Sequence, residues 1–346
     1  MARLCVCIAG DAVHIVVRTL IVSDLHLGSA SRADLLRVPE FRAPLFDALR
    51  EADRLVLLGD LLELRDGPPH EAMKAARPFF EELGRAFSGR EVVIVAGNHD
   101  HALVAPWLAR RGELGEADPL GLEQRLAVSA SPMLATLAQW AEPVRLSASY
   151  PGVWLRDDVY ATHGHYLDCH AGVTSGERLM IAVARRIPGR SSCPRSVDDY
   201  ESVTGPVYAR LDAFAVLRRL AYSRTAARLG RLLTGLRGDE LVRAERRAMG
   251  EAAARLELGD AYVVFGHTHR AGPFSGEDEL QWRGRLGARL INCGCWLGDN
   301  AVSDFARGRT TCLRGTCVVV EDAGPPTVAS LHRRVSATSQ RKTRAA

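Results

Sequence analysis

The chain has 346 residues, of which 47% are apolar and 25% are charged, and its formal net charge is +4 at pH 7. These values are average for a soluble globular protein, so they exclude global disorder, and so mild a charge does not by itself indicate nucleic-acid binding. The apolar residues 3–22 are interrupted by Asp11, His14 and Arg18. A membrane-spanning helix needs about 20 consecutive apolar residues, so we predict no transmembrane segment, an N-terminal extension over 1–16 and a cytoplasmic location.

Short apolar runs alternate with helical segments in the first hundred residues. The runs predict strands at residues 18–23, 54–58 and 91–96, and the segments between them predict helices over about 42–52 and 70–87. Continuous apolar runs separated by helices favour parallel strands that are buried on both faces. In open sheets of this kind, ligands gather beyond the carboxyl ends of the strands.

The pattern weakens between residues 101 and 150, where prolines punctuate helical pieces. Further strands are predicted at residues 144–147, 158–162, 261–265, 289–292 and 316–320. Residues 170–257 have a different character and are predicted to be a helical insertion. Apolar residues in its second part recur at spacings of three and four, as in an amphipathic helix, and arginines occupy the positions between them. The polar, basic residues 331–346 are predicted to be a disordered tail.

Polar clusters follow five of the predicted strands. They contain aspartate, asparagine and histidine at Asp24-Leu-His26, Gly59-Asp60, Gly97-Asn98-His99-Asp100, His163-Gly164-His165 and Gly266-His267-Thr268-His269. Each cluster alone is weak evidence, because an Asp-x-His or Gly-Asn-His-Asp sequence also occurs in turns. Together they offer the carboxylates, amide oxygen and imidazoles that a divalent metal site of borderline hardness requires.

These five clusters resemble the ordered motifs of the calcineurin-like metallophosphoesterase superfamily, from about residue 19 to residue 299. The resemblance implies an α/β fold, a four-layer α/β/β/α sandwich of two mixed sheets, with a phosphoesterase domain over residues 17–330. It also implies two divalent metal ions, with manganese favoured over iron or zinc. The implied metal ligands are Asp24, His26, Asp60, Asn98, His163, His267 and His269.

The resemblance also assigns roles within this set. Asp24, His26 and His269 hold the first metal, Asp60 bridges both metals, and the other ligands hold the second. His99 contacts the substrate phosphate and protonates the leaving oxygen, while Asp100 is positioned to orient His99. The roles of Glu63 and His165 stay open, because the family often has other residues at both positions.

These roles predict a hydrolase in which metal-bound hydroxide attacks phosphorus without a covalent enzyme intermediate. Two cations roughly 3.5–4 Å apart can hold phosphate oxygens and activate a bridging water. An unligated histidine such as His99 can act as an acid near neutral pH. The bond cleaved is a phosphodiester, a pyrophosphate or a phosphomonoester.

The sequence around Asp24 and Asp60 resembles two branches of the superfamily, the UDP-2,3-diacylglucosamine pyrophosphatases and the DNA-repair exonucleases. The position of the helical insertion favours the first branch, with a phosphorylated small molecule or nucleotide-linked lipid as substrate. Its arginines could bind a diphosphate, an anionic membrane surface or nucleic acid, although a solvated helix face is the simpler interpretation. A nucleic acid is the less favoured partner, since aromatic residues for base stacking are sparse. A non-catalytic metal-binding scaffold is a further alternative.

Overall fold

The computed structural model describes residues 17–113, 118–214, 239–298 and 315–331, so the predicted N-terminal extension, nearly all of the tail and part of the insertion lie outside the described residues. The described strands are β1 (Thr19–Val22), β2 (Arg54–Leu58), β3 (Glu91–Val95), β4 (Glu123–Leu126), β5 (Arg145–Arg156), β6 (Val159–Thr162), β7 (Tyr262–Phe265), β8 (Arg289–Asn292), β9 (Thr316–Val320) and β10 (Thr327–Ser330). The described α-helices are α1 (Pro39–Leu49), α2 (Pro69–Ala86), α3 (Ala105–Glu113), α4 (Pro132–Trp140), α5 (Gly176–Ala184), α6 (Val197–Ala213) and α9 (Asp239–Arg255).

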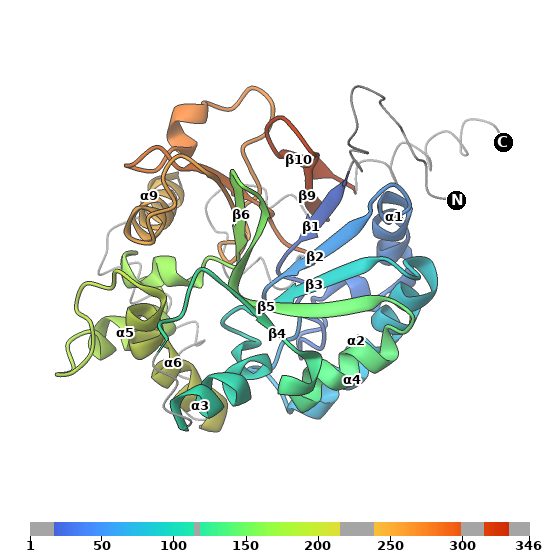
Figure 1. Cartoon of the computed structure of the whole chain (residues 1–346), viewed down its shortest axis with the longest axis horizontal. Coiled ribbons are helices and arrows are strands. Elements are labelled where there is room, and N and C mark those ends of the chain that lie inside the picture. Colours follow the sequence, from blue (N-terminus) through green and yellow to red (C-terminus); the bar gives the residue numbers. More distant parts are fainter. Residues whose placement is uncertain (1–16, 114–117, 215–238, 299–314, 332–346) are drawn as a thin grey trace.

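All ten strands belong to one mixed sheet, in the order β10-β9-β1-β2-β3-β5-β6-β7-β8, with β4 paired to β5. The expected sandwich of two mixed sheets is not shown by the pairing, in which the strands form one sheet. The reason is the length of β5: its residues Arg145–Ser149 pair parallel with β3, and its residues Gly152–Arg156 pair antiparallel with β6. Figure 1 shows the sheet turning at this strand, so that β6 is steeply inclined to β1, β2 and β3.

Three apolar clusters explain how the turned sheet is packed. One lies between the first half of the sheet and helices α1, α2 and α4, and a second lies between β6–β8 and helices α5, α6 and α9 (Figure 1). The third joins both halves of the sheet through side chains such as Ile21, Val56 and Val264. Strand residues alternate between faces, so the strands supply both the inner cluster and the helix-facing clusters. This arrangement is the reason that the predicted strands read as continuous apolar runs.

Most of the predicted elements are found close to their expected bounds. The strands predicted at 54–58, 289–292 and 316–320 match β2, β8 and β9. The helix predicted over 42–52 begins earlier, at Pro39, because proline suits the first turn of a helix, where its missing N–H has no partner to lose. Strands β4 and β10 were not predicted from the sequence; both are short edge strands. No helix in the described parts of the chain is long and apolar enough to cross a membrane.

Candidate metal centre

The predicted ligands lie in loops that begin where buried strands end. Asp24 and His26 follow β1, Asp60 follows β2, Asn98 follows β3, His163 follows β6, and His267 and His269 follow β7. Strands β1, β2 and β3 are parallel neighbours, as are β6 and β7. The turn of the sheet at β5 brings the ends of these two sets together.

Five of these ligands have an unusual backbone conformation. Asp24, His26, Asp60, His267 and His269 have φ values between 44° and 63°, in the left-handed region that residues other than glycine rarely adopt. Such strain persists where surrounding structure fixes it, and it clusters at functional sites.

The first group of ligands consists of Asp24, His26 and His269. The His269 Nε2 atom lies 3.0 Å from Asp24 Oδ1 and 3.4 Å from His26 Nε2. His26 Nε2 lies 3.9 Å from Asp24 Oδ1. Three donor atoms therefore surround one point, with separations that suit a shared cation.

The second group consists of Asn98, His163 and His267. Asn98 Oδ1 lies 3.1 Å from His163 Nε2 and 3.0 Å from His267 Nδ1. Asp60 connects this group to the first, because its Oδ2 atom lies 3.3 Å from His163 Nε2 and 3.7 Å from His26 Nε2. The carboxylate predicted to bridge two metals therefore lies between the two groups.

The outer nitrogens of the imidazoles test whether a cation fits here. His163 Nδ1 donates to the Leu58 carbonyl oxygen (3.1 Å), and His26 Nδ1 donates to a Glu63 oxygen (2.9 Å). His267 Nε2 donates to Asp168 Oδ2 at 3.0 Å. Because a neutral imidazole carries one N–H, the inner nitrogen of each ring then presents a lone pair.

These lone pairs face other lone pairs. Asn98 Nδ2 donates to Glu177 Oε1 at 3.1 Å, so Asn98 presents its oxygen to the inner nitrogens of His163 and His267. Acceptors that face one another at about 3 Å repel unless a cation or a proton lies between them. Metal-binding histidines ordinarily donate their outer N–H to a protein acceptor in this way. The donor set therefore fits a metal ion.

The electrostatics of the site agree with this fit. Burial lowers the pKa of the His163 imidazole, but the Asp60 carboxylate outweighs burial and raises that pKa to about 9. Burial raises the pKa of the Asp60 carboxyl, whereas His163 and His99 hold it well below its usual range. Buried carboxylates thus create a negative field at this point, which attracts divalent cations.

His99 is held by Glu63 and not by Asp100, which corrects the sequence analysis. The His99 Nδ1 atom lies 2.9 Å from each Glu63 oxygen. The Asp100 carboxylate instead accepts backbone N–H bonds from Gly97, Leu61 and Leu62, at 2.7, 2.7 and 3.2 Å. Asp100 therefore joins the loop that carries Asp60 to the loop that carries Asn98, and both of its oxygens accept backbone N–H bonds.

Glu63 contacts a ligand and the predicted acid at the same time. Its carboxylate accepts from His26 as well as from His99, and the three side chains form a further candidate metal-binding group. Burial lowers the pKa of His99, but Glu63 and Asp60 raise it to about 10. The imidazolium form of His99 is therefore favoured at neutral pH in this field.

His165 lies behind the centre. Its ring is buried among Tyr150, Tyr166 and Tyr208, and its centroid is 5.7 Å from that of His163. Within the described residues, neither of its ring nitrogens has a hydrogen-bond partner. Burial lowers its pKa well below the usual value. A neutral ring in this position supports His163 from behind and does not face substrate.

Gly97 is the position where the centre has no room for a side chain. A Cβ atom there would overlap the Asp60 carboxylate and the His163 ring. We predict that Gly97→Ala lowers the free energy of unfolding by about 1–3 kcal/mol, as overpacking typically does, and weakens metal binding. Thermal unfolding and a Mn²⁺ titration measure both effects. The control is Gly112→Ala, because no described atom lies within 4 Å of the added methyl group. Equal stability and metal affinity in Gly97→Ala and Gly112→Ala would contradict the prediction.

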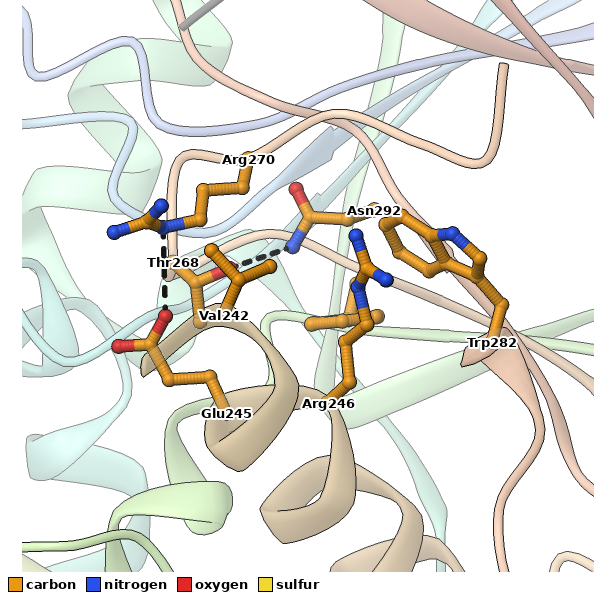
Figure 2. A pocket seen from close by; sticks show the side chains of 8 residues that line it. Val242, Glu245, Arg246, Thr268, Arg270, Trp282 and Asn292 are labelled. Atoms are coloured by element: carbon orange, nitrogen blue, oxygen red, sulfur yellow. Dashed lines mark hydrogen bonds and ion pairs between the residues drawn. The ribbon is translucent and has the colours of Figure 1, made fainter. Parts of the chain in front are cut away.

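A small pocket adjoins the loop that carries His267 and His269. Thr268 lines it together with residues from α9, β7 and β8 and the segments that follow these strands, namely Val242, Glu245, Arg246, Phe265, Arg270, Trp282 and Asn292. Figure 2 shows Arg270 directed at Glu245, and Arg246 beside Trp282. The Arg246 guanidinium lies over the Trp282 ring, 3.9 Å from its centroid. Arg246, one of the arginines of the predicted helical insertion, therefore packs against an aromatic ring. Other arginines of this insertion lie outside the described residues, namely Arg218, Arg219, Arg224, Arg228 and Arg231.

Three contacts at the site were not anticipated from the sequence. Asp168 holds His267, Glu177 holds Asn98, and Arg178 Nε donates to Asp168 Oδ1 at 2.7 Å. Asp168 follows His163 by only five residues, so its nearness in sequence to a predicted ligand could have marked it as a residue of the site. Glu177 and Arg178 come from the predicted insertion, and no local pattern marks them.

The fold and the two adjacent groups define a metal-dependent enzyme of the α/β class. The sequence profile of calcineurin-like phosphoesterases matches residues 17–271. The chain belongs to this family, and it is a metallophosphoesterase, a hydrolase with candidate His/Asp metal-binding groups. The chain is similar to the crystal structure of a dimetal phosphatase from Danio rerio, with 13% identity, 91% of this chain and 99% of that chain covered, and a TM-score of 0.36. A comparison with curated proteins finds no match.

Proposed function

We propose that this phosphoesterase hydrolyses a phosphodiester or pyrophosphate bond with two divalent cations bound at the candidate metal centre. The observation that carries the proposal is the set of lone pairs that converge from Asn98, His163 and His267 while their outer atoms are held by protein partners. Asp60 supports the second cation, because its Oδ2 atom lies 3.3 and 3.7 Å from histidines of both groups.

The cations would be held by the two groups described above, with Asp60 shared between them. Such ions lower the pKa of a bound water and neutralise charge on phosphoryl oxygens. The protein keeps the histidine ligands oriented through their outer N–H groups, so that little reorganisation is needed when charge develops.

His99 is the proposed general acid. Glu63 engages Nδ1 of the ring at 2.9 Å, and the side chain is partly exposed, at 17%. In this proposal the second ring nitrogen, Nε2, donates to the leaving oxygen of a substrate. Glu63 raises the pKa of His99 against the effect of burial, which favours the protonated ring that a general acid requires. Donation of a proton to the leaving group is the step in which the chain's own residues act most directly on the reaction.

Manganese is the proposed metal. The donors combine carboxylate oxygens, one amide oxygen and imidazole nitrogens, and no cysteine sulfur contributes to the candidate groups among the described residues. Sites that mix carboxylate or amide oxygens with imidazoles suit ions of intermediate hardness such as Mn²⁺ or Fe²⁺, whereas thiolates favour zinc.

For the physiological substrate, we propose a nucleotide-linked lipid diphosphate. The proposal is supported by the helical insertion that precedes the last motif, whose position resembles that of the pyrophosphatase branch; residues 59–63 resemble both branches. Helices α5 and α9 of this insertion contribute Arg178 and Glu245 next to the second group of ligands. A screen of diphosphates against single-stranded DNA separates this substrate from the exonuclease alternative.

Removal of metal is the first test of the proposed function. We expect the protein stripped with a chelator to lose hydrolysis of bis-p-nitrophenyl phosphate, and we expect two equivalents of Mn²⁺ per chain to restore it. The activity should rise only as the second equivalent of Mn²⁺ binds, because both groups of ligands contribute to the reaction. Saturation at two bound ions without hydrolysis of any phosphoester would instead favour the non-catalytic scaffold, and failure to bind metal would contradict the proposal.

A further inference from the structure

We propose that helix α5 of the insertion is part of the metal centre: Glu177 and Arg178 are positioning residues that hold Asn98 and His267 in the orientation that binds the second cation. This inference rests on the proposed function. It assigns a specific task to a segment that the sequence analysis treated as an insertion.

Glu177 determines which end of the Asn98 side chain faces the centre. Its Oε1 atom accepts from Asn98 Nδ2 at 3.1 Å and from Arg65 Nη1 at 3.0 Å. A carboxylate only accepts hydrogen bonds, so the amide nitrogen must face Glu177 and the amide oxygen must face the metal ligands. Without Glu177, a rotation of 180° would place a donor N–H₂ where the cation needs an oxygen.

Arg178 acts on His267 through Asp168. Its Nε atom donates to Asp168 Oδ1 at 2.7 Å, and Asp168 Oδ2 accepts from His267 Nε2 at 3.0 Å. Arg178 also donates to Glu245 Oε1 at 3.1 Å. Arg178 and Asp168 are both buried, and a buried carboxylate holds a fixed position only when its oxygens are satisfied. Arg178 therefore fixes the group that determines the tautomer of His267.

The two positioning residues are adjacent in sequence and lie at the start of α5. The helix begins after Ser175, whose side chain accepts from the Arg178 backbone N–H. This cap anchors the first turn, so both side chains are placed by one short rigid unit. The contact extends to α9, where Glu245 receives Arg178 and also lies 3.5 Å from Arg270 (Figure 2), the residue after His269.

Two ligands of the first group, Asp24 and His26, are held by residues outside the insertion. His26 is held by Glu63, and Asp24 accepts from Ser23 Oγ at 2.7 Å and from the His267 backbone N–H at 3.0 Å. Disturbing α5 should therefore affect the second cation and leave the first in place. This asymmetry separates a positioning role from a general contribution to stability.

The test measures stepwise Mn²⁺ binding in the whole protein by calorimetry, together with the electron paramagnetic resonance of the bound ions. We expect Glu177→Leu and Arg178→Ala to weaken the second binding step about 10–100-fold, the usual effect of losing a group that holds a metal ligand, with the first step within about twofold. The spectrum should change from that of a coupled pair of ions to that of a single ion at one equivalent per chain.

Conservative variants keep the test decisive if the first two fold poorly. Glu177→Gln retains an acceptor oxygen and should keep near-normal binding, whereas Arg178→Lys retains the charge but cannot reach Asp168 and Glu245 together and should weaken the second step about tenfold. The exposed Arg186, beyond the end of α5, supplies the control Arg186→Ala. Unchanged affinity for both ions in Arg178→Lys, or equal weakening of both steps, would overturn the proposal.

The outcome is separable from that of the proposed function. If the wild-type protein binds two ions and hydrolyses no phosphoester, the proposed function fails, while the comparison of binding steps still reports on α5. If the wild-type protein is active and every α5 variant keeps both affinities, only the inference about α5 fails.

Discussion

Replacement of Asp60 by asparagine is expected to lower metal-dependent turnover about 10²–10³-fold, the range seen when a single preorganised electrostatic group is removed from a catalytic site. The Asp60 Oδ2 atom lies near histidines of both groups, and its Oδ1 atom accepts the His99 backbone N–H at 2.8 Å. Asparagine keeps the shape but removes the charge that both cations share. The number of bound Mn²⁺ ions should fall from two to one.

The measurement combines steady-state hydrolysis of bis-p-nitrophenyl phosphate with a count of bound metal. The matched control is Asp47→Asn, because Asp47 is an exposed residue of α1. The control should retain full activity and two ions. Wild-type turnover by Asp60→Asn would show that Asp60 does not bridge a catalytic pair of metals.

Replacement of His99 by glutamine is expected to reduce turnover about 10²–10⁴-fold on a substrate with an alkoxide leaving group, which is the usual contribution of a general acid. The loss should be much smaller with p-nitrophenolate, because that leaving group departs without a proton. Metal stoichiometry should stay at two, although His99 belongs to a candidate group with His26 and Glu63. The ratio of the two losses is therefore the diagnostic quantity.

Two further variants define the role of His99. Glu63→Gln should give an intermediate loss, since one glutamine oxygen replaces a carboxylate that now accepts from both His26 and His99. His70→Gln is the control, because His70 is exposed at the start of α2. Equal losses on both substrates for His99→Gln would point to a role in binding the phosphoryl group, and a loss of one metal would make His99 a ligand.

The sequence alone determined where the strands of the sheet end and which residues follow them. Strands β1, β2, β3 and β7 consist mostly of aliphatic and aromatic residues that are buried on both faces, so their signal is local and strong. Polar residues directly after such runs must lie at the strand ends. The resemblance of those residues to the motifs of calcineurin-like phosphoesterases implied which ligands hold each metal. The structure brings all seven of these residues together.

The sequence did not determine how the strands join. The edge strands β4 and β10 read Glu-Gln-Arg-Leu and Thr-Val-Ala-Ser, and short, partly exposed strands have little apolar pattern to recognise. Strand β5 was predicted over only 144–147, yet it extends to Arg156 and joins both halves of the sheet. Pairing between distant segments decides that continuity, and no local sequence pattern records it.

The contacts behind the ligands were likewise decided by tertiary structure. The direction of a side chain in a tight loop depends on backbone dihedral angles, so Asp100 was expected to contact His99 and instead binds three backbone N–H groups. Glu177 meets Asn98 across 79 positions of sequence, a contact that exists only once α5 packs beside the sheet. Residue types and strand ends therefore specified the metal ligands, because these follow from local patterns. Only the folded chain specified which groups orient the ligands, because hydrogen bonds between distant segments depend on packing.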